Sequence, residues 1–158
     1  MIVLSLDLSL NCSGFAIFDT KKRNKKDKLI HYGHILNKHL DSTMTGHKLQ
    51  HIEMHLTMLK FAFFPEIIVK EELSGKGKTD TTQLAKTHGI CEKVFMGYPI
   101  YDINNMNFKK EFVGKGNATK EEVAEAVLKH IPELHFKTDD ESDAIGLGIL
   151  YLQKIGEW

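Results

Sequence analysis

The stretch IVLSLDLSLNCSGFAIF, residues 2–18, decides the fold of this chain. Two short apolar runs, at 1–6 and 14–18, enclose a polar loop. This pattern predicts two strands, and the first is expected at the centre of its sheet because it is almost wholly apolar. Asp7 follows at the end of that first strand, where burial of a carboxylate has a free-energy cost unless something compensates its charge.

The remainder of the chain continues with strands and then turns helical. A lysine-rich turn leads to a third strand around 29–36, which predicts an antiparallel meander at the start of the domain. The period of the apolar residues predicts four further elements, namely helices at 45–61 and 82–95, a strand from 67 to 71 or 72, and a strand at 100–103. A glycine-rich connection follows at 112–117.

Two capping boxes predict the last helices. Thr119 with Glu122 opens a helix that reaches about residue 130, and Thr138 with Glu141 opens one that reaches about residue 154. The element order predicts a single α/β domain over residues 1–158, with a five-stranded mixed sheet whose first three strands are antiparallel and whose faces carry helices.

The composition excludes several classes of protein. The chain has 158 residues, 42% of them hydrophobic and 27% charged, which is typical of one globular domain. No apolar run approaches the roughly 20 residues that span a bilayer, so we expect no membrane partner and a cytoplasmic protein. Cys12 and Cys91 are too few for a disulfide framework and are expected to be free thiols.

Lysine-rich segments are the first hint of a polyanionic partner. The total charge is balanced, with 21 basic and 21 acidic residues, so only the distribution is informative. Basic residues gather in three segments: Lys21, Lys22, Arg23, Lys25, Lys26 and Lys28; then Lys76 and Lys78; then Lys109, Lys110, Lys115 and Lys120. Each segment alone is typical of a solvated turn, whereas convergence on one face would indicate a nucleic-acid interface.

Side-chain alternation singles out one carboxylate on each of two strands. Asp7 shares a face with Val3 and Ser5, although alone it would be read as a loop residue bonded to nearby backbone amides. On the fourth strand Glu71 lies with the apolar set, whereas Glu72 lies with the charged one. Glu71 is therefore the better candidate for a constrained acid, the alternative being a strand-end glutamate paired with a lysine.

The last helix supplies two further acids. Asp140 and Asp143 share the packing stripe of Leu147, while Asp139 and Glu141 are left to serve the helix dipole and the cap. Both stripe aspartates should thus project toward the sheet that carries the strand-end acids.

A divalent-metal site is the economical explanation for these four acids. Clustered carboxylates repel, and their pKa values rise unless cations neutralise them. Oxygen ligands select Mg2+ or Mn2+, and two such ions about 4 Å apart are used for phosphodiester hydrolysis. The predicted catalytic and metal-binding residues are therefore Asp7, Glu71, Asp140 and Asp143.

These motifs, in this order, resemble the RuvC family of Holliday junction resolvases in the RNase H-like superfamily. The likeness covers nearly the whole chain and has a compact, phage-encoded character. The matching segments are residues 2–18, PEIIVKE at 65–71, FKKEFVGKGNATKEEV at 108–123 and DDESDAIGLGIL at 139–150. The resemblance implies that Asp7, Glu71, Asp140 and Asp143 are catalytic and that Lys109 and Lys120 are functional lysines.

The same resemblance implies a homodimer that binds a four-way DNA junction and nicks two strands symmetrically with two Mg2+ or Mn2+ ions per site. Its dimer interface would be the helix at 82–95. Lys120 would donate to the scissile phosphate, while Lys109, Lys110, Lys115, Lys76 and Lys78 would hold flanking phosphates. The family's wedge aromatic after the catalytic glutamate is missing here, where Leu73, Ser74 and Gly75 stand, which leaves junction specificity open.

Three other interpretations remain. The opening strands also occur in ATPases of the actin and Hsp70 type, although those need two such domains and 158 residues leave no room, so no nucleotide cofactor is expected. A second alternative is a junction-binding protein of this fold without chemistry. The third is Zn2+ binding by His47, His51 and His55 at helical spacing, for which a polar helix stripe is the simpler explanation.

Overall fold

A computed structural model describes residues 1–73 and 78–158 of the chain, with the backbone alone for residues 78–80. It contains the predicted sheet of five strands in the order β3-β2-β1-β4-β5. Pairing is antiparallel between β1, β2 and β3, and parallel between β1, β4 and β5, which confirms the predicted mixed sheet. The strands are β1 (Ile2–Asp7), β2 (Cys12–Asp19), β3 (Leu29–Leu36), β4 (Ile67–Glu71) and β5 (Ile100–Ile103).

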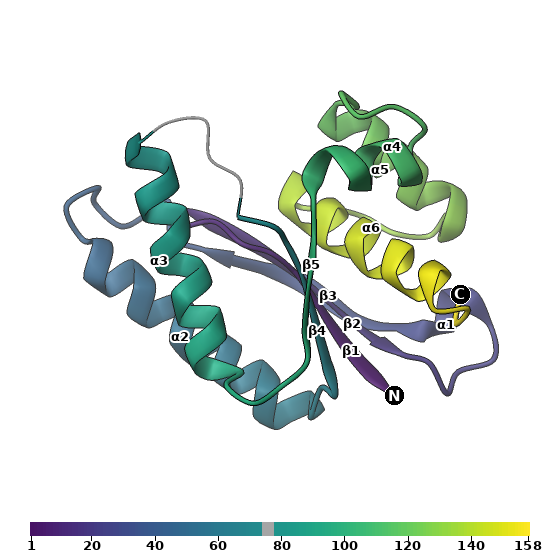
Figure 1. Cartoon of the computed structure of the whole chain (residues 1–158), viewed down its shortest axis with the longest axis horizontal. Helices are drawn as coiled ribbons and strands as arrows, with labels where there is room; N and C mark the ends of the chain where they lie inside the picture. The colour runs from purple at the N-terminus through teal and green to yellow at the C-terminus, as the bar shows by residue number, and fades with distance from the viewer. Residues whose placement is uncertain (74–77) are drawn as a thin grey trace.

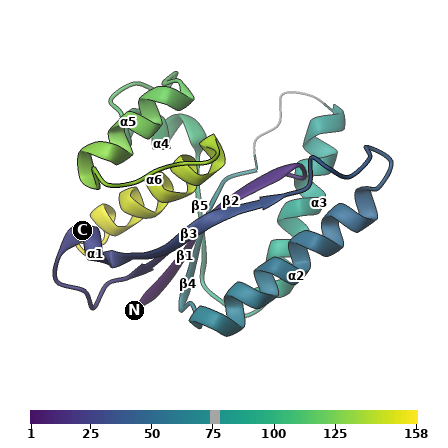
Figure 2. The same cartoon turned by 180° about the vertical axis from the view of Figure 1, so that it is seen from behind.

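Helices cover both faces of this sheet (Figures 1 and 2). One face carries α2 (Thr45–Phe63) and α3 (Lys78–Val94), and the other carries α4 (Asn105–Phe112), α5 (Lys120–His130) and α6 (Asp139–Lys154). A single turn, α1 (Lys25–Lys28), lies between β2 and β3. The arrangement is the predicted three-layer α/β fold.

Strand alternation divides the core into two clusters. Val3 on β1 and Val69 on β4 are buried together with Leu147 of α6, whereas Leu4 and its neighbours on the other side of β1 are buried with Ile52 of α2. Each wholly buried aliphatic side chain contributes about 1.5–3 kcal/mol relative to an exposed one. The alternation also sends Asp7 and Glu71 to the face that α6 covers, as the sequence predicts.

Helix α6 lies unusually close to the sheet because glycines stand where it crosses β2. A Cβ atom at Gly14 would lie 1.8 Å from the backbone oxygen of Asp140, so no larger residue fits there without displacing the helix. At Gly148 a Cβ atom would lie 2.1 Å from ring carbon Cε2 of Phe18. These contacts bring the N-terminus of α6 directly against the strand that pairs with β1.

The two predicted capping boxes have different outcomes. At α5 the box is complete, since Thr119 Oγ1 accepts from the backbone of Glu122 and the Glu122 carboxylate accepts from the backbone of Thr119. At α6 only half of it forms: Thr138 caps the helix, but Glu141 is buried, and its carboxylate accepts from the backbone amide of Lys137 instead of that of Thr138. Predicting Glu141 as an exposed cap residue was wrong because a tertiary partner, described below, competes for its carboxylate.

Several helix boundaries also differ from the predicted ones. Helix α2 continues to Phe63 and ends at Phe64, which adopts the left-handed conformation with φ of 50°. Helix α3 begins at Lys78, four residues before the predicted start. Helices α1 and α4 were not predicted, since each is short and carries few apolar residues. In the described part of the chain, no helix is long and apolar enough to cross a membrane.

Candidate active site

The strand-end acids lie at one edge of the sheet. Strands β1 and β4 are parallel neighbours with Leu6 opposite Lys70, so Asp7 and Glu71 leave the sheet at the same edge. Asp7 pairs with Gly14 on β2, and Gly14 in turn contacts the backbone of Asp140 at the start of α6. The close approach of α6 thus delivers the predicted Asp140 and Asp143 to the edge where β1 and β4 end.

Electrostatics confirm that Asp7 lies among like charges. Burial raises the pKa of its carboxyl well above the usual range, and the nearby charges of Asp143, Glu71 and Asp140 raise it further. The positive charge of Lys120 opposes this rise. The structure therefore brings all four predicted acids, together with the predicted lysine, within electrostatic reach of one another.

Asp143 is the least satisfied member of this group. Its Oδ1 atom is buried and has no hydrogen-bond partner in the described part of the chain. Burial raises the pKa of its carboxyl to about 6, an effect that Lys120 and Lys109 partly offset. A buried carboxylate oxygen without a partner has a free-energy cost, which makes this oxygen a candidate ligand for a group from outside the chain.

Glu71 is held by a residue that the sequence analysis did not identify. Asn105, in the first turn of α4, donates from Nδ2 to Glu71 Oε1 at 2.7 Å. Burial raises the pKa of the Glu71 carboxyl, while this hydrogen bond and the charge of Lys109 lower it. Its neighbour Glu72 is exposed and accepts from Asn104, so the structure separates the two glutamates as strand alternation predicts.

A second unpredicted pair anchors the start of α6. Glu141 Oε1 lies 2.7 Å from His34 Nδ1 on β3, and Glu141 Oε2 accepts from the backbone amide of Lys137 at 2.7 Å. Asp140 and Asp143 lie on either side of Glu141 at the start of α6, so these contacts also fix the part of the helix that carries them. In the sequence, Glu141 is marked only by its capping-box position and by its place next to Asp140. Neither feature could reveal His34 as its partner.

The predicted lysines are distributed unevenly around these acids. Lys120 faces several of them: burial lowers its pKa, but the charges of Asp140, Asp139, Asp143 and Asp7 raise it more, so its net shift is upward. Lys109 also lies near the acids, and its charge therefore lowers the pKa values of Glu71 and Asp143.

The other predicted DNA-binding lysines are less informative. Lys110 is exposed at the end of α4, and Lys115 forms an ion pair with Glu122 at 2.5 Å, which reduces its availability to a phosphate. Lys76 lies outside the described residues, and of Lys78 only the backbone is described.

The block of basic residues at 21–28 does not extend this site. Ile2 pairs with Asp19, so the connection from β2 to β3 leaves the sheet at the end of β1 opposite Asp7 (Figure 1). Lys26 forms an ion pair with Glu133 at 3.2 Å, and Lys28 contacts the backbone oxygen of Glu157. Of the two interpretations of this segment, its position therefore favours the solvated turn over convergence with the other basic segments at the acids.

The chemistry of the donor set suits a hard cation, although the side chains do not stand in a ready-made coordination geometry. Among residues 1–73 and 81–158, no three His, Cys, Asp or Glu side chains form a preorganised metal site. Four converging carboxylates, one with an orphaned oxygen and three with raised pKa values, nevertheless fit divalent cations with oxygen ligands. His51 and His55 instead direct their Nδ1 atoms at protein oxygens.

No protein-family model matches the chain, but individual curated proteins do. The crossover junction endodeoxyribonuclease RuvC of Cereibacter sphaeroides is 26% identical over 160 residues, which cover 98% of this chain and 91% of that protein. The RuvC of Cytophaga hutchinsonii is 28% identical, covering 97% of this chain and 77% of that protein. These relatives are bacterial, so they give no support to the expected phage-type placement.

Solved structures agree with these relatives in fold. RuvC of Thermus thermophilus in complex with a Holliday junction substrate superposes with a TM-score of 0.79 at 19% identity, covering 99% of this chain and 97% of that one. The yeast mitochondrial Holliday junction resolvase has a TM-score of 0.64 at 12% identity, covering 98% and 80%. The resemblance seen in the sequence motifs is thus confirmed: over nearly its whole length, this chain is similar in sequence and fold to the RuvC crossover junction endodeoxyribonucleases.

Proposed function

We propose that this protein is a metal-dependent endonuclease that binds four-way DNA junctions and nicks two of their strands symmetrically. One observation carries the proposal: Asp7, Glu71, Asp140 and Asp143 converge at one sheet edge, and a buried Asp143 oxygen there has no partner within the described chain. The likeness to RuvC proteins along nearly the whole sequence supplies the substrate class.

The four acids would hold two Mg2+ or Mn2+ ions. Bound there, the ions would supply Lewis-acid chemistry by activating water and stabilising the leaving oxygen of the phosphodiester. Asp7 would be one of the ligands, and the charges of Asp143, Glu71 and Asp140 all act on its carboxyl, which supports a shared site. The hydrogen bond from Asn105 holds Glu71 in one orientation before any ion arrives, while Glu141 and His34 fix the turn that carries Asp140 and Asp143.

Lys120 would neutralise the charge that develops on the scissile phosphate. It occupies the first position of α5, where free backbone amides also favour an anion. Its pKa is raised by the surrounding acids, so it remains a hydrogen-bond donor at neutral and mildly alkaline pH. Lys109, and more weakly Lys110, would hold neighbouring phosphates in the same strand.

We also propose a homodimer that acts in the cytoplasm. A twofold dimer presents two equivalent sites to a junction of matching symmetry, which explains paired nicks. Helix α3 would form the interface: Gly89 on this helix has open space where a Cβ atom would stand, so another helix has room to approach. Sedimentation of the protein with and without Gly89→Gln tests this directly, since the larger side chain should shift it toward the monomer.

Cleavage of a synthetic four-way junction tests the proposed activity. Each strand is labelled in turn, and nicking is measured with Mg2+, with Mn2+ and with EDTA. Asp7→Asn and Glu71→Gln keep the size of the side chain but remove its charge, and each should lower the rate by at least about a thousandfold, equivalent to about 4 kcal/mol. Binding of the junction should persist in both variants.

Glu72→Gln is the matched control, because it makes the same chemical change in the adjacent glutamate, which follows β4 and is exposed. It should leave the rate within about twofold. Full activity of Asp7→Asn would overturn the proposed chemistry. Junction binding without metal-dependent nicking by the parent protein would instead favour a non-catalytic junction-binding protein.

A further inference from the structure

Lys48 on α2 is a buried cation without an acidic partner at salt-bridge distance in the described part of the chain. Its residue exposure is 5%, and its ammonium donates to the Asn11 side-chain oxygen at 2.8 Å. Asp41 lies within electrostatic reach, but it is exposed and accepts hydrogen bonds from the amide and hydroxyl of Thr43. This neutral amide leaves the positive charge of Lys48 unpaired, so the ammonium can still accept an anion as a partner.

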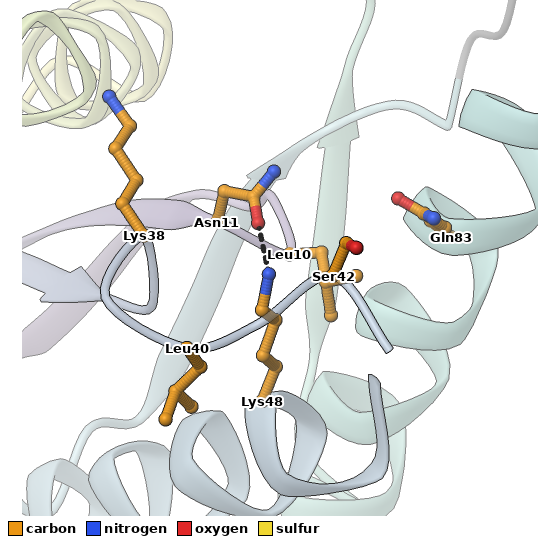
Figure 3. Close-up of a pocket in the computed structure, with 7 residues that line it drawn as sticks. All are labelled: Leu10, Asn11, Lys38, Leu40, Ser42, Lys48 and Gln83. Carbon is orange, nitrogen blue, oxygen red and sulfur yellow. Dashed lines mark hydrogen bonds between the residues drawn. The ribbon is translucent and has the colours of Figure 1, made fainter. Parts of the chain in front are cut away.

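A hollow opens at this lysine. It has a volume of about 340 Å³, and its polar lining comes from Asn11, Lys38, Ser42, Lys48 and Gln83, with no carboxylate among the lining residues. Figure 3 shows Lys48 rising from α2 toward Asn11, while the extended side chain of Lys38 points toward α6. The Lys48 ammonium and several neutral polar groups thus surround this hollow, with Lys38 at its rim, and ammonium, amide and hydroxyl groups are suitable donors to phosphate oxygens.

The hollow adjoins the candidate active site. A second hollow, of about 360 Å³, shares Asn11 and Lys38 with it and is also lined by Lys120 and Asp140. The two neighbouring hollows are called here the Lys38 groove; their lining residues extend from Asp139 and Asp140 at the start of α6, past the β1–β2 loop, to Gln83 on α3. Lys38 stands where the two hollows meet, and it has no ion pair within the part of the chain that the structure describes.

We propose that the Lys38 groove binds the phosphodiester backbone of the DNA strand as it leaves the active site, with Lys38 and Lys48 each neutralising a phosphate. The inference rests on the proposed function, because that function supplies the DNA. These contacts reach phosphates and not base edges, so they fix the position of the strand independently of its sequence. The groove would thereby favour binding of a junction arm whose strand runs from the cleavage site toward α3.

A purely structural role for Lys48 makes a different prediction. The Lys48 backbone oxygen accepts from Asn37, and Asn37 donates its own amide to the backbone oxygen of Asn11, so Lys48 also helps to hold the β1–β2 loop. If holding the loop were its only role, Lys38 would not matter, since it takes no part in these hydrogen bonds. Lys38 is therefore the residue that decides between the two roles.

The test is a cycle that combines protein and DNA changes. Junction binding is measured for the full chain in the Asp7→Asn background, so that the DNA stays intact, with single methylphosphonates that remove the charge of one phosphate at a time. Lys38→Gln should weaken binding several-fold and lower the slope of log affinity against log salt by about 0.7–0.9. A methylphosphonate at the contacted position should weaken binding by the parent but not by Lys38→Gln.

Lys22→Gln is the control, because Lys22 is an equally exposed lysine at the opposite end of the sheet. It should change neither the slope nor the response to any methylphosphonate. Lys48→Met should abolish the response at a second, neighbouring phosphate, and thermal unfolding of the same variant shows whether it is folded. Lys48→Arg, which keeps the charge, should retain that response.

Three outcomes overturn the inference. Lys38→Gln could match Lys22→Gln at every phosphate, which would remove the groove from the DNA path. Lys48→Met could lose binding equally at all positions, which would mark a structural role only. Inorganic phosphate could stabilise the parent but not Lys48→Met while DNA binding is unchanged, which would assign the hollow to a free anion. None of these outcomes affects the nicking test with Asp7→Asn, so the two proposals fail separately.

Discussion

Lys70 and Glu71 are adjacent on β4, but they face opposite sides of the sheet and opposite kinds of charge environment. Lys70 is 3% exposed, and its ammonium lies 2.5 Å from Asp102 Oδ1, 3.0 Å from His88 Nδ1 and 3.8 Å from Glu92 Oε1. Glu71 instead joins three aspartates, with Asn105 as its hydrogen-bond donor. The first cluster is complete within the chain, whereas the second has more negative charge than the chain compensates.

This difference separates a structural charge cluster from a functional one. Both contain groups whose pKa values burial shifts, so a shifted pKa alone would not identify the active site. The two clusters differ in whether each polar atom has a partner. The Lys70 ammonium lies near His88, Asp102 and Glu92, whereas Asp143 Oδ1 has no hydrogen-bond partner among the described residues. Substitutions in the two clusters should therefore differ in their effects on stability and on nicking.

Gly14→Ala should have the greatest effect, because it separates the acids of α6 from Asp7. The added methyl group would lie 1.8 Å from a backbone oxygen, which cannot rotate away as a side chain would. We expect a loss of about 3 kcal/mol or more in the free energy of unfolding and undetectable nicking. Urea unfolding and the junction assay measure both.

Gly46→Ala is the control for this change, since a Cβ atom there meets open space in the first turn of α2. It should change the free energy of unfolding by less than about 1 kcal/mol and leave nicking intact. A fully active, stable Gly14→Ala protein would show that the site tolerates displacement of α6, contrary to the packing argument.

Lys70→Met should be the next largest change, because it removes the cation from the completed cluster. Breaking a buried ion pair costs about 3–5 kcal/mol, but Asp102 is half-exposed and can regain water, so about 2–3 kcal/mol is expected. Urea unfolding measures the loss. Junction nicking by the folded fraction should fall far less than for Glu71→Gln, the adjacent change on the other face. Equal loss of nicking in the two variants would contradict the division of roles.

Asp143→Asn should stabilise the metal-free protein. Its folded-state pKa of about 6 lies above the ordinary 3.8, so the folded form binds the proton more tightly and stability falls as pH rises from about 4 to 6. The difference corresponds to at most about 3 kcal/mol at neutral pH, and about 2 kcal/mol is expected after relaxation. Unfolding of parent and variant in EDTA at pH 4 and pH 7 measures it, with the gain present only at pH 7.

His88 provides the matching change on the opposite face. Burial and the charge of Lys70 lower the pKa of His88 from 6.5 to about 4, so its contribution to stability is lost as pH falls from 6.5 toward 4. This slope is opposite in sign to that of Asp143. His88→Gln should therefore leave a protein whose stability declines more steeply as pH rises through this window. A slope equal to that of the parent would contradict the lowered pKa of His88.

His34→Gln should have the smallest effect of these five changes. It weakens the hold of β3 on Glu141, which orients the turn that carries Asp140 and Asp143. We expect a loss of about 1 kcal/mol in stability and a fall in nicking of about tenfold, with junction affinity unchanged. Because Gln can still donate to Glu141, His34→Ala should be more severe, and the reverse order would exclude this positioning role.

Much of this fold could be predicted because the decisive signals are local. The period of two along β1 and β4 assigned Asp7 and Glu71 to one face and separated Glu71 from Glu72. The period of the last helix directed Asp140 and Asp143 toward the same layer. These patterns depend only on backbone geometry, which is the same in every strand or helix.

Features that depend on contacts between distant segments could not be predicted in this way. Glu141 has the pattern of an exposed helix cap, and only the position of His34 on β3 explains why it is buried. Asn105 lies in a short helix with no strong apolar period, so neither its helix nor its bond to Glu71 was visible. The lysines at 21–28 have the composition of a DNA-binding segment, but they lie at the end of the sheet opposite the acids.

The glycine contacts of α6 also bear on how the site could adapt to a bound cation. Gly14 and Gly148 hold the helix against β2 at two separate places, so rotation of the helix about its axis would bring it into collision with the strand at one place and with Phe18 at the other. Adjustments that bring the carboxylates together must then come from side-chain torsions. Two cations of different radius would thus be accommodated by different rotamers of the same acids, with the helix fixed in place.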